Sequence, residues 1–289
     1  MAAIVLILLF SMSTSAFALS DTAGSYTQVS LANAPKVSGQ FTVYLSISSN
    51  KVNGQYIHRY NLPVSMGSMG QNKTYYVSDV MTAAQNQYSW LTVQGLSNNY
   101  INGIKDSTIG NTVFGPVTGY DNYNGWMFRI NGKYPLLNQA DWPSGWTSTM
   151  GPCGAAINQA YVTAGQKIDF YHADTMNTVR ATHSFKNDPI SYSSGVLNTK
   201  LYSSYSYFDA SNNYKWIIKN YSLVKNKTFQ VVVDGNISKT IVCDSSGNAK
   251  VTGLNLSPGS HTIEILPQFV TFGIYGIPKY SGAKLNFNV

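Results

Sequence analysis

The chain has 289 residues and a formal net charge of +7, and only 11% of its residues are charged, against roughly 25% in an average soluble domain. This composition excludes a coiled coil and a charge-rich disordered tail. With 21 tyrosines and 24 glycines, strand formers and turn formers are both plentiful, so a mainly β protein of about two domains is expected.

The first residues have the pattern of a secretory signal peptide. An apolar run over 4–10 is followed by Ala16-Phe17-Ala18, the small-x-small tripeptide that a signal peptidase accepts. We expect residues 1–18 to be removed, leaving an N-terminal segment over 19–37. The alternative is an uncleaved membrane anchor, but the apolar run is too short to span a bilayer. The mature protein is expected to be secreted and associated with the cell surface, without stable membrane insertion.

Two strands and a helix are predicted next. Apolar and polar residues alternate over 41–48, which indicates a half-buried strand, and a second strand is predicted over 56–64. The period then changes over 77–87, where an apolar stripe follows Ser78 as a possible N-cap and Asp79 in the first turn. One short helix packed on a sheet is therefore expected.

A hairpin is predicted further along the chain. The run 125–130 leads into Asn131-Gly132 and then into 133–137. Asn-Gly between two such runs is a strong hairpin signal, because both central residues of a type I′ turn have positive φ. Another alternating strand is predicted over 167–171, which closes the first domain near residue 174.

The second half reads as a series of short strands. The stretch 175–189 is polar and lacks periodicity, so we place a linker there. Beyond it, turn signals such as Asp234-Gly235 recur at close spacing, which favours an immunoglobulin-like β-sandwich over 190–289. The strands predicted there are 214–218, 229–233, 239–242, 249–254, 261–266 and 283–289.

The order of elements in the first half resembles a known family. Val43-Tyr44-Leu45, the helix near Val80, the hairpin Gly125-Trp126-Met127-Phe128-Arg129-Ile130-Asn131-Gly132 and the closing strand Lys167-Ile168-Asp169-Phe170-Tyr171 resemble the bacterial transcobalamin-like C-terminal domain. The resemblance covers about half of the mature chain, and the hairpin with the closing strand is its specific part. It implies a β-grasp-like domain over 38–174. In animal cobalamin carriers the related domain closes over a corrin ring, so the resemblance implies a corrinoid or another small planar ligand.

The second half is similar, more loosely, to bacterial cell-surface immunoglobulin-like modules. The similarity lies in Val233-Asp234-Gly235, in Asp244-Ser245-Ser246-Gly247, and in Leu256-Ser257-Pro258-Gly259-Ser260-His261-Thr262-Ile263. It implies a spacer or adhesive role, without a ligand of its own.

Aromatic residues near the hairpin are the candidate ligand-binding residues. Trp126 and Phe128 share one face of their strand, and flat rings stack well on a corrin or on a sugar. Burial in the core is the more common role of such rings. We expect the hairpin tip and the loop over 141–146 to form the ligand edge. The candidate residues are Trp126, Phe128, Tyr134, Leu136, Trp142 and Trp146.

The sequence argues against an enzyme. Glu264 is the only glutamate, whereas most glycosidases use a glutamic acid beside a second carboxylate. No nucleophile elbow, phosphate loop or dinucleotide fingerprint is present. The four histidines lack the spacing of zinc ligands, and Cys153 with His172 has no flanking signature of a nucleophile and its base. We therefore expect no catalytic residue, metal or cofactor, and a non-catalytic binding protein.

Two alternatives remain open from the sequence. The ligand is either a planar small molecule or a cell-wall or extracellular glycan, because the chain is rich in Trp and Tyr and weakly charged. Scattered lysines favour loose contact with an anionic cell wall and not the recognition of nucleic acid. Cys153 and Cys243, the only cysteines, are a possible disulfide joining the two halves, or else one exposed and one buried thiol.

Overall fold

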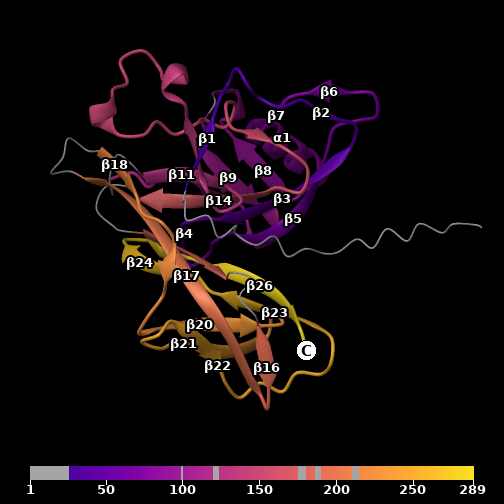
Figure 1. Cartoon of the computed structure of the whole chain (residues 1–289), viewed down its shortest axis with the longest axis vertical. Coiled ribbons are helices and arrows are strands. Elements are labelled where there is room, and N and C mark those ends of the chain that lie inside the picture. Colours follow the sequence, from indigo (N-terminus) through magenta and orange to yellow (C-terminus); the bar gives the residue numbers. More distant parts are fainter. Residues whose placement is uncertain (1–25, 99, 120–123, 175–179, 186–189, 210–214) are drawn as a thin grey trace, which may run out of the picture.

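The structure is a computed structural model that describes residues 26–98, 100–119, 124–174, 180–185, 190–209 and 215–289. The predicted signal peptide over 1–18 lies outside these ranges. The described residues form a mainly β protein with one α-helix. In Figure 1 the first half, up to residue 174, lies above the second half. No helix in the described ranges is long and apolar enough to cross a membrane.

The first half is built around a mixed sheet of four strands in the order β11-β14-β3-β5. β14 is parallel to β3, and the other two pairs are antiparallel. The strands of the first half are β1 (Tyr26–Val29), β2 (Val37–Ser38), β3 (Phe41–Ser48), β4 (Lys51–Val52), β5 (His58–Met66), β6 (Asn72–Lys73), β7 (Tyr75–Tyr76), β8 (Leu91–Gln94), β9 (Gly103–Asp106), β10 (Val113–Phe114), β11 (Asn124–Ile130), β12 (Tyr134–Leu137), β13 (Tyr161–Val162) and β14 (Lys167–Asp174). Four 3-10 helices lie between them: η1 (Leu96–Asn98), η2 (Ser107–Ile109), η3 (Gln139–Asp141) and η4 (Ser148–Met150).

The predicted helix is confirmed as α1 (Val77–Gln87). Its buried residues Val77, Val80, Met81 and Ala84 form the apolar stripe that packs on the sheet. The predicted cap is wrong, because Ser78 lies inside the first turn and Tyr76 is the N-cap residue. The carboxylate of Asp79 accepts a hydrogen bond of 2.8 Å from the backbone N–H of Tyr76. A carboxylate in the first turn also stabilises the positive end of the helix dipole.

The Asn-Gly turn forms, but the hairpin after it does not continue. Asn131 and Gly132 both have positive φ, and Ile130 and Lys133 exchange two backbone hydrogen bonds across the turn. Beyond that bridge, β12 turns away and pairs in parallel with β1 instead. Pro135 lies in β12 and has no backbone N–H to donate to a ladder. Among the strands that the structure describes, β11 is therefore an edge strand, with β14 as its one partner.

The second half is built around a curled sheet of 13 strands, which includes β4 of the first half. Seven of them, β15-β17-β22-β21-β20-β23-β26, are each antiparallel to the next. The sheet curls far enough for β15 to contact β26, the last strand in this order. The strands of this half are β15 (Arg180–Phe185), β16 (Ser191–Ser193), β17 (Val196–Asp209), β18 (Lys215–Ile218), β19 (Ser222–Leu223), β20 (Lys227–Val233), β21 (Ile237–Cys243), β22 (Asn248–Val251), β23 (Ser260–Ile265), β24 (Gln268–Phe272), β25 (Tyr275–Ser281) and β26 (Ala283–Asn288).

Part of the predicted linker is a strand. Residues 180–185, inside the range 175–189, form β15, which pairs with β17 on one side and with β25 on the other. Its last residue, Phe185, is buried in the second core. The other residues of that range, 175–179 and 186–189, lie outside the described part of the chain.

The two halves have separate apolar cores and an extensive junction. β4 of the first half pairs with β25 of the second, and the long strand β17 extends from the curled sheet toward the first half with β18 beside it (Figure 1). The possible disulfide is not formed: Cys153 and Cys243 are free and buried. Cys153 lies in the first core and Cys243 in the second. The sequence offers two cysteines but no information on which core each one enters.

Candidate ligand-binding site

A cavity of about 310 Å³ lies in the first half, next to β11. Four of the six predicted residues line it: Trp126, Phe128, Tyr134 and Trp146. The remaining lining side chains are apolar or aromatic, and none of the described lining residues is charged. The volume is at the lower end of the range of roughly 300–1,000 Å³ that is usual for ligand pockets.

The cavity lies between one face of β11 and the start of β12. Trp126, Met127 and Phe128 are consecutive, and all three line the cavity. Phe170 of β14 lines the cavity as well, so the cavity reaches the face of β11 that carries Trp126 and Phe128. Tyr134 and Pro135 line it from β12, which leaves the outer edge of β11 after the turn.

Aromatic rings make the inner wall. The ring of Phe128 stacks on Phe170 of β14, with centroids 5.3 Å apart and planes 18° from parallel. Trp126 lies 6.5 Å from the same Phe170 ring, and its indole N–H donates a hydrogen bond of 3.2 Å to the carbonyl oxygen of Phe114. The indole nitrogen is therefore satisfied within the protein, and the faces of the rings are what remains for a ligand.

The opposite wall is the chain segment 152–157 together with Trp146. Backbone hydrogen bonds hold this segment against β12: Leu137 donates to the carbonyl of Cys153, and Ala155 donates to the carbonyl of Pro135. The indole N–H of Trp146 donates to the carbonyl oxygen of Gly151 at 3.0 Å. The wall is thus held by hydrogen bonds to main-chain carbonyl groups of Cys153, Pro135 and Gly151.

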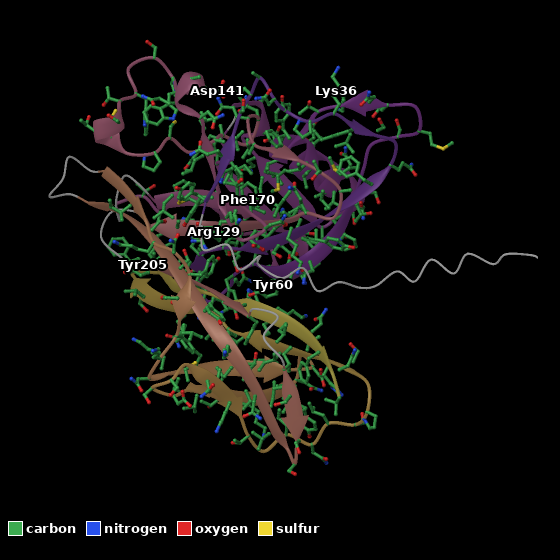
Figure 2. The ribbon with its side chains drawn as sticks, in the orientation of Figure 1. Lys36, Tyr60, Arg129, Asp141, Phe170 and Tyr205 are labelled. Atoms are coloured by element: carbon green, nitrogen blue, oxygen red, sulfur yellow. The ribbon has the colours of Figure 1, made fainter. Side chains whose placement is uncertain are left out.

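Tyr134 connects the cavity to a buried cation. Arg129 is fully buried, and its Nη2 donates to the Tyr134 hydroxyl at 2.9 Å. Tyr171 donates to the same oxygen at 2.6 Å, which leaves the Tyr134 proton for the Ser206 hydroxyl of β17, 2.8 Å away. Nη1 of Arg129 donates to Tyr221 at 2.7 Å. Figure 2 shows Arg129 near the junction of the two halves.

The electrostatics of this cluster keep its groups in their usual protonation states. Burial lowers the pKa of Arg129, but the nearby oxygens of Tyr134, Tyr221 and Tyr171 raise it by more than burial lowers it. The pKa of Arg129 therefore lies well above its ordinary value. Burial raises the pKa of the Tyr171 and Tyr221 hydroxyls. The guanidinium is therefore charged, and the phenols remain neutral hydrogen-bond donors.

Two predicted residues do not reach the cavity. Leu136 is buried in a small cluster with Tyr134, Tyr171 and Ala173 at the other face of β11 and β14. Trp142 packs against the first core, and its indole N–H donates to the carbonyl of Leu137 at 3.1 Å. The hairpin tip is also occupied within the protein, because Tyr221 donates to the Gly132 carbonyl. Of the expected ligand edge, formed by the hairpin tip and the loop over 141–146, Trp146 lines the cavity.

Several lining residues were missed by sequence reasoning. Phe170 and Met127 lie on strands that were predicted, but nothing in their pattern indicates a cavity beside them. Tyr100, Ile101 and the segment 154–157 come from irregular chain, where periodicity gives no signal. In the sequence, the turn Gly151-Pro152-Cys153-Gly154 was the only local sign that the chain reverses direction near the segment 154–157.

Among the described residues, the site holds no cluster of metal-ligating side chains. In the part of the chain that the structure describes, no three His, Cys, Asp or Glu side chains gather as a metal site would require. His172 is buried, and its ring lies 6.0 Å from that of Trp126. The described lining of the cavity offers apolar and aromatic surface.

Comparison with known protein families, with curated proteins and with solved structures gives no match for this chain. The resemblance to transcobalamin-like domains stays a prediction that rests on the residues quoted for it.

Proposed function

We propose that the chain is a non-catalytic binding protein whose first half takes up a small apolar group of an external molecule in the cavity beside β11. The observation that carries this proposal is the cavity itself, with its aromatic wall and its uncharged lining. Concave, mostly apolar sites with few polar groups are the usual form of small-ligand sites.

The size of the cavity bears on the ligand. A flat ring fits against the stacked Phe128 and Phe170 side chains. A whole corrinoid is larger than a cavity of about 310 Å³, so a corrinoid would enter with one edge or one side group only. A corrinoid, as the family resemblance implies, is therefore one of the ligands that this proposal includes.

The finer architecture is part of the same proposal. A helix packed on a sheet with a central parallel pair, β14 and β3, supports a β-grasp-like first half. The antiparallel strands of the second half support an immunoglobulin-like module, although they form one continuous curled sheet. Secretion and association with the cell surface stay predictions from the first residues of the sequence.

A glycan is the second candidate ligand from the sequence. Proteins bind sugars with an aromatic face and several polar side chains around it, and the lining of this cavity has few polar groups. Trp142 and Trp146 already donate their indole N–H groups to backbone carbonyls. The apolar group is for these reasons the better supported ligand.

Intrinsic fluorescence tests the proposal, because Trp126 and Trp146 line the cavity. A panel of flat aromatic dyes and cobinamide is titrated into the protein, beside a pull-down on cell-wall polysaccharide. We expect at least one flat probe to quench the tryptophans in a saturable manner. The variant Ala156→Phe, which puts a ring into the cavity wall, is expected to abolish the effect, whereas Ala164→Phe at an exposed turn leaves it unchanged. Unchanged fluorescence across the panel, or equal binding by both variants, contradicts the proposal.

A further inference from the structure

Within the described ranges, the outer edge of β11 carries backbone groups that no other strand pairs with. Asn131 donates to the Lys167 carbonyl across the pair of β11 and β14, so the odd-numbered residues of β11 direct their N–H and C=O groups toward β14. The even-numbered residues direct theirs outward. Ile130 meets Lys133 there, but among the described residues no hydrogen bond uses the backbone groups of Trp126 or Phe128.

The residues that carry these groups line the apolar cavity. Trp126 is only 7% exposed, and it lies in the wall of the apolar cavity together with Phe128. A buried backbone donor or acceptor that lacks a partner costs free energy comparable to a lost hydrogen bond. The outer edge of β11 thus offers backbone hydrogen-bonding groups beside the cavity.

We propose that the apolar group bound in the cavity is a side chain of an extended peptide, and that the peptide backbone adds as a strand to the outer edge of β11. This inference rests on the proposed function and names the class of its ligand. Main-chain hydrogen bonds to an exposed sheet edge give affinity in this mode of recognition, and a pocket for alternate side chains gives specificity.

The cavity sets the expected form of the peptide. Its three lining strand residues, Trp126 to Phe128, extend over about 10 Å of strand, so about three peptide residues pair with the edge. The lining is uncharged and aromatic, which favours an apolar or aromatic side chain at the position that enters the cavity. Charged side chains at that position are disfavoured by the cost of desolvation.

N-methylated peptides test the pairing separately from the burial of the side chain. The probe is a dye-labelled, capped peptide with the sequence Thr-Val-Thr-Phe-Thr-Val, and its binding to the full chain is measured by fluorescence anisotropy. Six further peptides each carry one backbone N-methyl group, which removes one donor. A strand presents its N–H groups alternately to the two sides. We therefore expect N-methylation at every second position near Phe to weaken binding by about tenfold, the effect of losing about 1.4 kcal/mol, with smaller changes at the positions between.

The outcomes separate this inference from the proposed function. Ala156→Phe is expected to abolish peptide binding, and Ala164→Phe to leave it intact. If flat dyes bind and the peptides do not, or if all six N-methylated peptides bind equally, the peptide inference is wrong and the proposed function stands. If neither dyes nor peptides bind at the cavity, both are wrong. If the free protein forms a dimer that the peptide does not dissociate, the edge of β11 pairs with a second copy of the chain. In that case the peptide inference is wrong.

Discussion

The hydroxyl oxygen of Tyr134 lies 2.8 Å from that of Ser206, which bonds a wall of the cavity directly to the second half of the chain. Tyr134 also accepts hydrogen bonds from Arg129 and Tyr171. Arg129 in turn reaches Tyr221 of the second half. The cavity is therefore supported by side chains from both halves, and changes at their junction are expected to affect the first half.

Removal of the Tyr221 hydroxyl tests the buried cluster. The variant Tyr221→Phe leaves Nη1 of fully buried Arg129 without its 2.7 Å partner. An unsatisfied buried donor of this kind costs about 1–3 kcal/mol, so we expect the free energy of unfolding in urea to fall by about that amount. Tyr26→Phe, at a side chain that is 48% exposed, is the matched control. Equal stability of both variants and the parent protein would show that the cluster contributes nothing.

The ion pair of His261 and Asp234 predicts a pH dependence. Nδ1 of His261 lies 2.7 Å from the Asp234 carboxylate, and Nε2 lies 2.7 Å from the Ser257 carbonyl oxygen. Both partners only accept hydrogen bonds, so the doubly protonated ring fits best, and these bonds raise the pKa of His261. Burial opposes ionisation of Asp234, but hydrogen bonds from His261 and the Thr262 N–H outweigh it and lower the pKa of Asp234.

The sign of the effect follows from these two directions. The raised pKa of His261 stabilises the fold below the ordinary value of 6.5, and this contribution is lost as the pH rises through the raised pKa. The lowered pKa of Asp234 stabilises the fold above 3.8 and loses its effect as the pH falls. We expect the difference in thermal unfolding midpoint between the parent protein and His261→Gln to be greatest near about pH 5. A difference that is the same at acidic and at alkaline pH contradicts this account.

The two thiols are expected to be unreactive in the folded protein. Burial raises the pKa of Cys153, and burial with the nearby charge of Asp244 raises the pKa of Cys243 to about 11. The thiolate is the reactive form, so iodoacetamide at neutral pH is expected to label neither cysteine before unfolding and both after it. Mass spectrometry without reductant measures this directly. A mass lower by two hydrogens, with no labelling after unfolding, would show a disulfide instead.

Local patterns predicted the parts of the fold that local chemistry decides. The helix over 77–87 has an apolar stripe and an acidic first turn, and both are found in α1. Asn131-Gly132 makes its turn because both residues tolerate positive φ. The mainly β class follows from composition and from alternating runs that became strands such as β3 and β20.

The rest depends on contacts that no local pattern contains. The long strand β17 was not predicted, because the inward residues of its second part are serines. Ser204 is buried and bonds the carbonyl of Lys219, and Ser206 bonds Tyr134. The open edge of β11 was missed for a related reason: the Asn-Gly signal describes the turn, whereas the departure of β12 results from its pairing with β1.

Amide chemical shifts of isotope-labelled protein test most directly whether the open edge of β11 is a binding site. In a titration with the capped Thr-Val-Thr-Phe-Thr-Val peptide, the N–H resonances of Trp126 and Phe128 are expected to shift downfield, as new hydrogen bonds require. Those of Met127 and Arg129, which face β14, are expected to move much less. Saturating peptide that leaves Trp126 and Phe128 unshifted, or that shifts only residues far from the cavity, would contradict the account.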